Sequence, residues 1–281
     1  MAATTTWINN GIARQCYLLA LSVVIVWLTS QTAWATKASS LDVCDDAVWP
    51  PYTFQISKAG ATRPDGASYE LLQALAKELN LRIDFHILPW KRCLLQVHAY
   101  PQTGMEMFIN GYSNQERVSK YLHTIPVYNV HLGYAFHRDH MDKFNNIRNI
   151  TDLNNMMVCG VLGYNYEDII GAGLTAEIVT ASTTVQGVMD RIANQQCEVM
   201  LTTFEVVESG IAFNKLKASP NFVHRRLQGA KPIHIHYCIA RPSPRSESLL
   251  NDFKAAIRKL QANGTADRIF SRFLPNGDGI P

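Results

Sequence analysis

The sequence predicts an α/β fold arranged in two lobes. Apolar strands alternate with amphipathic helices, and a strand–helix–strand order implies a parallel sheet with a right-handed crossover. This order begins again after a polar linker at residues 139–149. Two half-sized series, with a strand near each junction, predict a chain that crosses between the lobes twice. The expected division is a signal peptide at 1–35, the first lobe at 36–128, the second lobe at 129–233 and a return to the first lobe at 234–281.

The N-terminus has the three parts of a secretory signal peptide. Arg14 is the only charged residue before Lys37, and an apolar run follows it at residues 16–28. Ala33-Trp34-Ala35 then matches an A-x-A cleavage site. The apolar run is too short for a comfortable membrane span. We therefore expect export to the periplasm with cleavage after Ala35.

Composition and charge limit the partners of this chain. The formal net charge of the 281 residues is +3, and removing residues 1–35 takes away a single arginine. So small and scattered a charge gives no argument for nucleic acid as a partner. No second long apolar run appears, which leaves no support for a membrane anchor after cleavage. We expect a monomer.

The first lobe is predicted from its periodicity. Apolar residues recur at helical spacing from Tyr69 to Leu79, whereas residues 82–88 alternate as a strand does. Pro50-Pro51 ends the first strand and presents Trp49 and Tyr52, either as a lid on the core or as a surface on which a ligand stacks. The expected elements are strands at 41–44, 82–88 and 105–109, and helices at 69–80 and from 91 onward; a strand at 131–136 then opens the second lobe.

The elements of the second lobe and of the return segment are also predicted from the pattern of apolar and polar residues. Glu167 and Asp168 suit the positive end of a helix that begins there. The expected elements are strands at 156–162, 176–179, 197–201 and 234–240, and helices from 167, at 185–194, from 202, at 247–262 and at 265–273.

The polar stretch at residues 110–117 closes a buried strand and organises the chain. Met105, Met107 and Ile109 face one way, and Gly111 then stops the strand. Asn114 can cap a short helix that carries Arg117. An arginine just beyond the carboxyl end of a strand lies where α/β sheets bind ligands, and its planar fork suits a carboxylate. The alternative is a surface arginine that pairs with Glu116.

Taken together, these features resemble the periplasmic solute-binding proteins of ABC importers, in the family that includes the polar amino-acid binders. The residues that carry the resemblance span almost the whole chain after the signal peptide, and their order and spacing are more specific than any one of them. They are Trp49-Pro50-Pro51-Tyr52, Gly66, Tyr69-Glu70-Leu71-Leu72, Pro89-Trp90-Lys91-Arg92-Cys93-Leu94, Glu116-Arg117, Pro126-Val127-Tyr128, Asp152-Leu153, 158–163 and Asn263-Gly264-Thr265.

The resemblance implies a two-lobed fold of the type II periplasmic-binding-protein kind, each lobe a mostly parallel sheet flanked by helices. It implies a small carboxylate-bearing solute, bound between the lobes and delivered to the membrane permease subunits of an ABC importer. The chain crosses between the lobes at residues 128–132 and 232–234.

The resemblance also implies roles for individual side chains. Trp49 and Trp90 match positions where an aromatic ring packs on the ligand, and Asn110 and Tyr112 match polar contacts from the first lobe. Arg117 matches the arginine that grips a ligand carboxylate. In the second lobe, Tyr164 and Asn165 match a turn whose backbone N–H groups face that carboxylate.

The sequence departs from the family at Thr203. Amino-acid binders carry an aspartate there for the α-ammonium group of the ligand, and a hydroxyl supplies no compensating charge. Either Glu198, Glu205 or Asp46 substitutes for that aspartate, or the ligand is not an ordinary α-amino acid.

Five cysteines follow the expected cleavage site, an odd number without a C-x-x-C motif. The predicted fold brings Cys44, at the end of the first strand, near Cys93, at the start of a helix, so these two form the preferred disulfide. Cys159 and Cys197 would lie on adjacent strands and are candidates for a second disulfide. Cys238 would then be free.

The sequence gives less support for a metal site or for an enzyme. His234 and His236 point to one face of a strand, but a metal site needs further ligands at suitable spacing, so we expect hinge histidines with polar partners. Asp45 and Asp46 are adjacent, and neighbouring strand residues face opposite ways. Neither a G-x-S-x-G motif nor a phosphate loop is present. We expect neither catalysis nor a cofactor.

Two alternatives to transport remain open at this stage. A few proteins of this fold are dehydratases or other lyases. Others present a bound ligand to a membrane sensor, and the sequence does not separate that role from transport.

Overall fold

The computed structural model describes residues 39–58 and 60–274. The expected signal peptide at 1–35 lies outside these residues. Within the described part of the chain, no helix is both long and apolar enough to cross a membrane.

The first lobe is built on a six-stranded sheet in the order β5-β1-β6-β14-β7, with β8 pairing to β14. Three parallel strands, β5, β1 and β6, form its core, and β14 is antiparallel to β6, β7 and β8. The strands are β1 (Ser39–Asp45), β5 (Leu81–Ile87), β6 (Met107–Tyr112), β7 (Tyr121–His123), β8 (Tyr128–Val130) and β14 (Ile233–Ala240). The helices are α2 (Ala67–Glu78), α3 (Trp90–His98), α4 (Tyr100–Thr103), α5 (Gln115–Lys120), α10 (Ser246–Ala262) and α11 (Thr265–Phe270).

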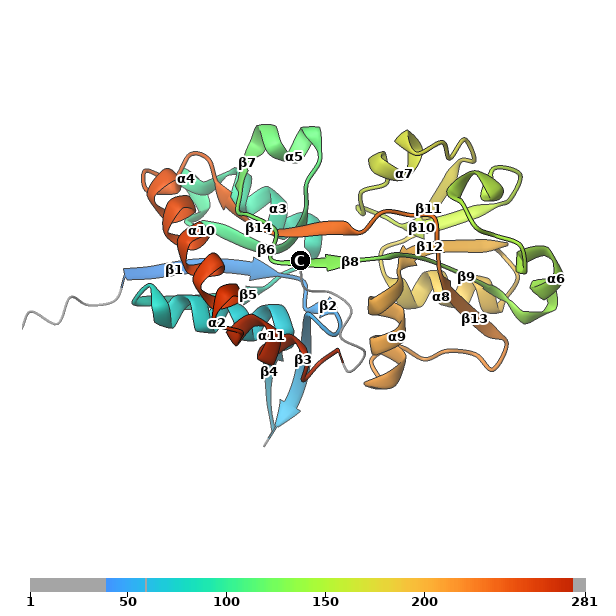
Figure 1. The fold of residues 1–281 in the computed structure, drawn as a ribbon, viewed down its shortest axis with the longest axis horizontal. Coiled ribbons are helices and arrows are strands. Elements are labelled where there is room, and N and C mark those ends of the chain that lie inside the picture. Colours follow the sequence, from blue (N-terminus) through green and yellow to red (C-terminus); the bar gives the residue numbers. More distant parts are fainter. Residues whose placement is uncertain (1–38, 59, 275–281) are drawn as a thin grey trace, which may run out of the picture. The chain divides into compact units, whose positions relative to one another are not determined.

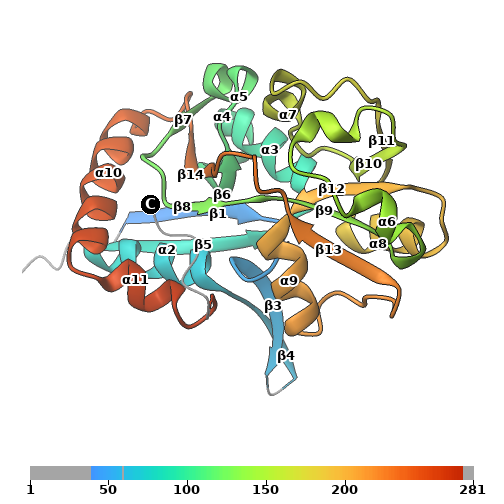
Figure 2. The ribbon, with the colours of Figure 1, turned by 45° about the vertical axis from the view of Figure 1, so that its right-hand side comes forward.

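Alternation along the strands gives this sheet two buried faces. Val43 and Met107 belong to the apolar cluster that includes residues of α2, α10 and α11. Their neighbours Cys44 and Phe108 belong to a second cluster with Cys93 of α3. Helices therefore cover both faces, with α2, α10 and α11 in mutual contact on one of them (Figures 1 and 2).

The second lobe has a five-stranded sheet in the order β11-β10-β12-β9-β13. Again three parallel strands, β11, β10 and β12, form the core, and β9 and β13 extend it in antiparallel fashion. Its strands are β9 (Leu132–His137), β10 (Val158–Val161), β11 (Ile178–Ser182), β12 (Val199–Thr203) and β13 (Phe222–Arg226). Its helices are α6 (Met141–Phe144), α7 (Glu167–Gly171), α8 (Val185–Ala193) and α9 (Phe204–Ala212), with the 3-10 turns η1 (Arg138–His140) and η2 (Ile150–Leu153).

Two connections join the lobes (Figure 1). Strand β8 passes through His131 into β9, and residues 227–232 lead from β13 back to β14. At the first crossing, the buried Glu205 of α9 accepts the His131 backbone N–H at 3.0 Å and lies 2.5 Å from its Nδ1. The first crossing is thereby fastened to the helix that follows β12.

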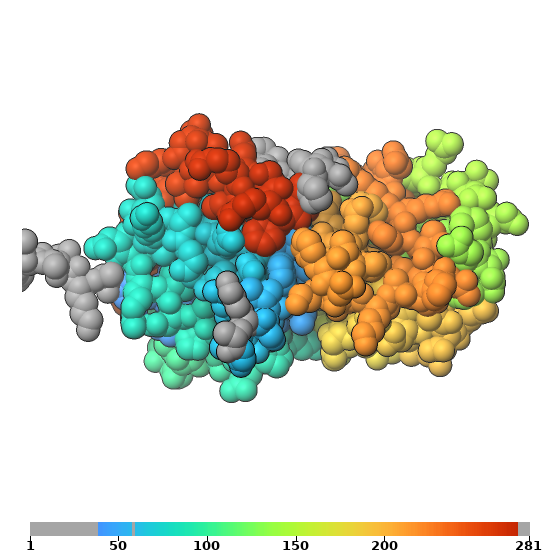
Figure 3. All heavy atoms as spheres, turned by 90° about the horizontal axis from the view of Figure 1, so that it is seen from below, coloured from blue at the N-terminus to red at the C-terminus, as the bar shows by residue number. Residues whose placement is uncertain are grey.

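A small antiparallel sheet, not expected from the sequence, follows β1. It comprises β2 (Val48–Trp49), β3 (Thr53–Lys58) and β4 (Ala61–Asp65). The hairpin reaches the second lobe, because Lys215 Nζ donates to the Gln55 carbonyl at 2.7 Å and lies 5.5 Å from the centre of the Phe54 ring. Figure 3 shows these two parts of the chain in contact, blue against orange.

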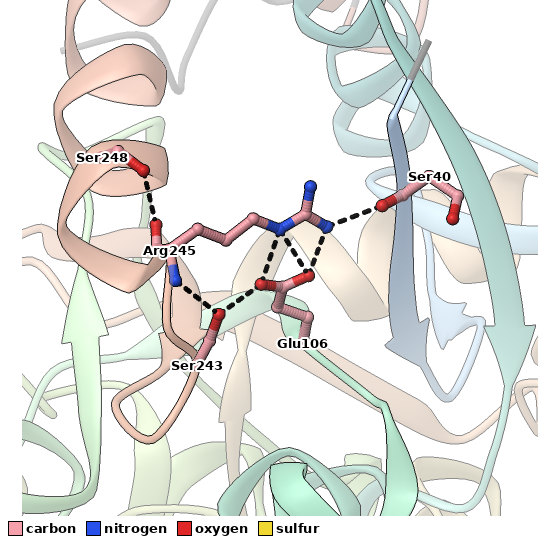
Figure 4. Close-up of polar contacts among 5 residues, drawn as sticks. All are labelled: Ser40, Glu106, Ser243, Arg245 and Ser248. Atoms are coloured by element: carbon pink, nitrogen blue, oxygen red, sulfur yellow. Dashed lines mark hydrogen bonds and ion pairs between the residues drawn. The ribbon is translucent and has the colours of Figure 1, made fainter. Parts of the chain in front are cut away.

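A buried ion pair fixes the start of α10 (Figure 4). Glu106 is 3% exposed, and Arg245 grips its carboxylate through Nε at 2.9 Å and Nη2 at 2.5 Å. Ser243 Oγ also donates to Glu106, and Arg245 Nη2 reaches the Ser40 carbonyl at 2.6 Å. This network ties the return segment to β1 and to the beginning of β6.

Two disulfides match the expected pairs. Cys44 is bonded to Cys93, with Cα atoms 5.7 Å apart, and Cys159 to Cys197, with Cα atoms 6.2 Å apart. Cys44 can reach Cys93 because its side chain points to the sheet face that α3 covers. Cys238 is free and buried, as expected.

Candidate functional site

A small cavity lies where residues of the two lobes meet. Its eight lining residues are Asp45, Asp46, Trp49, Trp90, Asn110, Tyr112, Arg117 and Tyr164. The cavity volume is about 20 Å³, room for about one water molecule. Seven of the expected ligand-binding residues are thus brought together, six from the first lobe and Tyr164 from the second.

Arg117 is a buried cation at this cavity. Asn114 caps α5 as expected, its Oδ1 accepting the Arg117 N–H at 2.7 Å. The guanidinium lies 5.5 Å from the centre of the Trp90 ring, and Nη1 donates to the Tyr112 carbonyl at 3.3 Å. Burial lowers the pKa of Arg117, which is 6% exposed.

The surface alternative for this arginine is not what the structure shows. Glu116 is exposed and pairs with Lys120, one helical turn away, at 2.5 Å. Among the residues that the structure describes, no acid lies within ion-pair distance of Arg117. Within the described chain, its guanidinium contacts the Trp90 ring and the Tyr112 carbonyl.

Two carboxylates line the same cavity, and the expectation that Asp45 and Asp46 face opposite ways is wrong. Alternation ends because β1 stops at Asp45, and Ala47 just beyond has a left-handed backbone with φ 52°. Burial raises the pKa of Asp45 well above its ordinary value, and the charge of Asp46 adds to this rise. Burial also raises the pKa of Asp46, to about 6.

Asn110 holds Asp45 in place. Its Nδ2 donates to Asp45 Oδ2 at 2.5 Å and to Thr53 Oγ1 at 2.8 Å, and its Oδ1 accepts from Tyr128 Oη at 2.7 Å. Asn110 has φ 62°, a left-handed conformation inside a strand, which asparagine tolerates better than most residues. The β6–β14 register is irregular here, so a bulge turns Asn110 toward the cavity.

Trp49 and Tyr52 take separate roles after Pro50-Pro51. Trp49 lines the cavity, whereas Tyr52 is fully buried and stacks on Tyr128 with ring centres 4.0 Å apart. Tyr52 therefore packs in the core, whereas stacking of a ligand on Trp49 stays a prediction.

Two expected residues lie outside the cavity. Asn165 lines a neighbouring groove, and its Oδ1 accepts the Glu167 N–H at 3.0 Å. Thr203 is buried at the end of β12, and its Oγ1 lies 2.8 Å from Tyr112 Oη. Thr203 therefore contacts Tyr112, which lines the cavity, and does not line the cavity itself.

The three acids considered as substitutes for the missing aspartate differ in whether they line the cavity. Glu198 pairs with Lys143 at 2.5 Å, outside the cavity. Glu205 is committed to His131. Of the three, Asp46 alone lines the cavity.

The strand histidines have polar partners, as expected. Nδ1 of His234 lies 2.6 Å from Asn129 Oδ1, and Nδ1 of His236 lies 2.7 Å from the Thr124 carbonyl. Both line a hollow of about 1080 Å³ beside the second crossing, which contains none of the expected ligand-binding residues. A groove of about 480 Å³ shares Arg117 and Tyr164 with the cavity and adjoins it.

Asp45 is the residue that sequence reasoning missed. The strand rule excluded it, although the acidic pair directly before the Trp49 loop was visible. Asp45 is 1% exposed and lines the cavity, with Asn110 as its partner. The signal that could have identified it is the end of the strand, where alternation no longer applies.

Two α/β lobes, joined by two crossings around a small polar and aromatic cavity, define the class of type II periplasmic-binding-protein folds. The chain belongs to the bacterial extracellular solute-binding proteins, family 3, whose family model matches residues 41–276. No curated protein matches the chain by sequence.

Solved structures of three kinds share this fold. An amino-acid ABC transporter substrate-binding protein from Streptococcus pneumoniae, bound to L-arginine, aligns with a TM-score of 0.68 at 14% identity, over 85% of this chain and 96% of its own. A histidine kinase sensor domain aligns with a TM-score of 0.68 at 18% identity, over 85% and 97%. An ancestral amino-acid-binding protein, a precursor of cyclohexadienyl dehydratase, aligns with a TM-score of 0.66 at 20% identity, over 84% and 95%. At such identities the likeness establishes the fold alone.

Proposed function

We propose that this protein captures a small zwitterionic solute, an amino acid or a related compound, in the periplasm and delivers it to an ABC importer. Arg117 grips the carboxylate of the solute, and Asp46 with Asp45 faces its cationic group. The rings of Trp49 and Trp90 form the walls. Membership of the solute-binding family supports this proposal.

The buried guanidinium of Arg117 is the observation that carries the proposal. A charge taken out of water is costly unless it is paired and hydrogen-bonded. Arg117 is 6% exposed, and its one side-chain hydrogen bond within the described chain goes to the Tyr112 carbonyl. A ligand carboxylate would supply the missing partner, and bidentate pairing with a guanidinium is strong and directional.

The acidic pair sets the second requirement. Asp45 and Asp46 line the cavity with Arg117, so the site has opposite charges on separate elements, α5 and the end of β1. A molecule with one carboxylate and one cationic group complements both. A simple dicarboxylate would bring an uncompensated anion to the acidic pair.

Binding requires the two lobes to move. A cavity of about 20 Å³ is far smaller than an amino acid, so the solute enters an open form and the lobes then close over it. The crossings at His131 and residues 227–232 are the hinges. The closed, loaded form is what the membrane permease subunits recognise, and closing lobes are a common means of such coupling.

A lyase is the second candidate, and the Asp45–Asp46 pair is the observation that favours it. Carboxyl groups with raised pKa values can donate protons near neutral pH. Incubating the protein with a ligand that it binds would identify this activity, if the ligand is consumed and a dehydrated product forms. A sensing role would use the same closing cavity.

A thermal-shift panel of amino acids, organic acids, amines and small peptides tests the proposal. A ligand at a hundred times its Kd stabilises the protein by about 2.7 kcal/mol, which raises the Tm of a domain of this size by about 5 to 10 °C. We expect such a shift with one or more zwitterions and none with the matching amines that lack a carboxylate. Shifts by amines alone, or by no zwitterion at millimolar concentration, would contradict the proposal.

A further inference from the structure

Half of the residues around the cavity are aromatic. Trp49, Trp90, Tyr112 and Tyr164 join the two aspartates, Asn110 and Arg117 in its wall. We propose that the cationic group of the ligand in this cavity is an N-alkylated ammonium, as in a betaine-type carboxylate, and not a primary ammonium. This inference rests on the proposed function.

Three of the rings form a corner. The Trp49 and Tyr112 rings have centres 6.0 Å apart and planes at 86°, and the Trp49 and Tyr164 rings have centres 5.5 Å apart and planes at 74°. Near-perpendicular rings on several sides of a small space resemble the aromatic cages that bind quaternary ammonium groups. Tyr164 belongs to the second lobe, so closure completes this corner.

The polar tips of two of these rings are engaged with other residues. Trp49 Nε1 donates to Tyr128 Oη at 3.2 Å, and Tyr112 Oη lies 2.8 Å from Thr203 Oγ1. These hydrogen bonds fix the rings and leave their carbon surfaces to the cavity wall. Such surfaces attract a diffuse cation through their quadrupoles and pack against its methyl groups.

Asn110 and Asp45 already use much of their hydrogen-bonding capacity. Both polar atoms of the Asn110 side chain are occupied, and Asp45 already accepts from Asn110 and from the Asp46 N–H at 2.8 Å. Among the described residues, Asp46 accepts one hydrogen bond, from the Val48 N–H at 3.2 Å, so its carboxylate keeps free acceptor positions. A primary ammonium carries three donors, and a buried donor without a partner is costly.

The molecule already contains one cation bound on an aromatic face in this cavity. The Arg117 guanidinium lies 5.5 Å from the centre of the Trp90 ring. With Trp90 so engaged, the corner of Trp49, Tyr112 and Tyr164 is left for the ligand, and Asp46 provides the opposite charge. An alkylated ammonium needs only this combination, since it has few or no N–H donors.

Calorimetric titration with matched pairs tests the inference. The pairs are glycine against N,N,N-trimethylglycine, and 4-aminobutyrate against 4-(trimethylammonio)butyrate. We expect the trimethylated member of at least one pair to bind tenfold more tightly or better. Trp49→Leu should weaken the trimethylated ligand more than tenfold, whereas Trp49→Phe, which keeps a ring, should retain most of the affinity and confirm that the fold tolerates a change here.

The outcomes separate this inference from the proposed function. If the primary amine binds as tightly as its trimethylated partner, the inference is overturned while the binding function stands. The same holds if neither pair binds but an ordinary amino acid binds in an Arg117-dependent way. If no zwitterion binds at all, the proposed function fails and the inference fails with it.

Discussion

Tyr112 and Thr203 meet across the two lobes, with Tyr112 Oη 2.8 Å from Thr203 Oγ1. Tyr112 ends β6 beside the cavity, and Thr203 ends β12 as the residue before α9. The contact therefore joins a ring that lines the cavity in the first lobe to the second lobe. Opening of the lobes, as proposed above, should break it.

A double-mutant cycle tests whether this contact stabilises closure. Tyr112→Phe and Thr203→Val each remove one hydroxyl, so each should weaken ligand binding by about 1 kcal/mol, or roughly fivefold. The double variant should be no weaker than either single variant, because both remove the same interaction. Fully additive losses in titration calorimetry would show that the hydroxyls act independently.

A second contact between the lobes lies outside the cavity. Lys215 Nζ donates to the Gln55 carbonyl and lies over Phe54, whose ring centre is 5.6 Å from that of Phe213. Lys215→Met should favour the open form and weaken ligand binding about two- to fivefold. Its effect on the Tm of the ligand-free protein should be small, because the lost contacts lie between the lobes.

Lys217→Met is the matched control for this substitution. Lys217 is exposed, and its backbone hydrogen bonds go to Gln186 within the second lobe. Small-angle scattering should show a more extended ligand-free Lys215→Met protein and an unchanged Lys217→Met protein. Equal scattering profiles for the two variants would show that Lys215 does not stabilise the closed form.

Binding of a zwitterion should depend on pH through Asp46. Burial raises its pKa to about 6, so the carboxyl is largely protonated below pH 6 and charged above it. The ligand cation prefers the charged form, so affinity should rise by up to about tenfold per pH unit below pH 6 and level off above it. His123, near Arg117, has a pKa of about 4 because it is buried, so it stays neutral across pH 5–7.

Calorimetry at pH 5, 6 and 7 checks this dependence. Asp46→Asn should bind more weakly at pH 7 and lose most of the pH dependence. If the wild-type affinity is flat across this range, or falls as the pH rises, Asp46 does not face the ligand cation.

The Glu106–Arg245 pair should stabilise the fold without affecting binding. Glu106→Gln should lower the free energy of unfolding by about 3 kcal/mol, at the low end for a buried pair because the Arg245 side chain is 33% exposed. Ligand affinity should be unchanged, since Glu106 precedes β6 and Asn110 lies near its other end. Urea unfolding measures the loss.

Glu116→Gln is the control, since it breaks an exposed pair with Lys120 and should cost about 0.5 kcal/mol or less. Equal losses for the two variants would mean that the buried network contributes no more than a surface pair.

The regular parts of the fold could be predicted because their periodicity is strong. The helix expected at 247–262 is α10 (Ser246–Ala262), and the strand expected at 234–240 is β14 (Ile233–Ala240). The β3–β4 hairpin was missed, since Pro64-Asp65-Gly66 is typical of a turn, whereas Pro64 pairs with Gln55 near the end of a largely exposed strand. Such pairing depends on a partner that local sequence does not specify.

The candidate site was predictable in its residue types but not in its fine geometry. Arg117 was predicted from its place just beyond a strand and Trp90 from the family resemblance, and both line the cavity. Asp45 was excluded by a strand rule that fails one residue past the strand end, and Asn110 is turned inward by a left-handed backbone. Neither the end of β1 nor that bulge leaves a periodic pattern in the sequence.

Titration of Arg117→Met with the zwitterion that gives the largest shift in the thermal panel tests most directly whether Arg117 anchors the ligand carboxylate. Arg82→Met is the control, since Arg82 is an exposed arginine of the first lobe that pairs with Asp84 at 2.8 Å. We expect Arg117→Met to lose thirtyfold or more in affinity, about 2 kcal/mol or more for a buried charge pair, and Arg82→Met to bind as the wild type does. Wild-type affinity in a folded Arg117→Met protein would contradict the role of Arg117 as the carboxylate anchor.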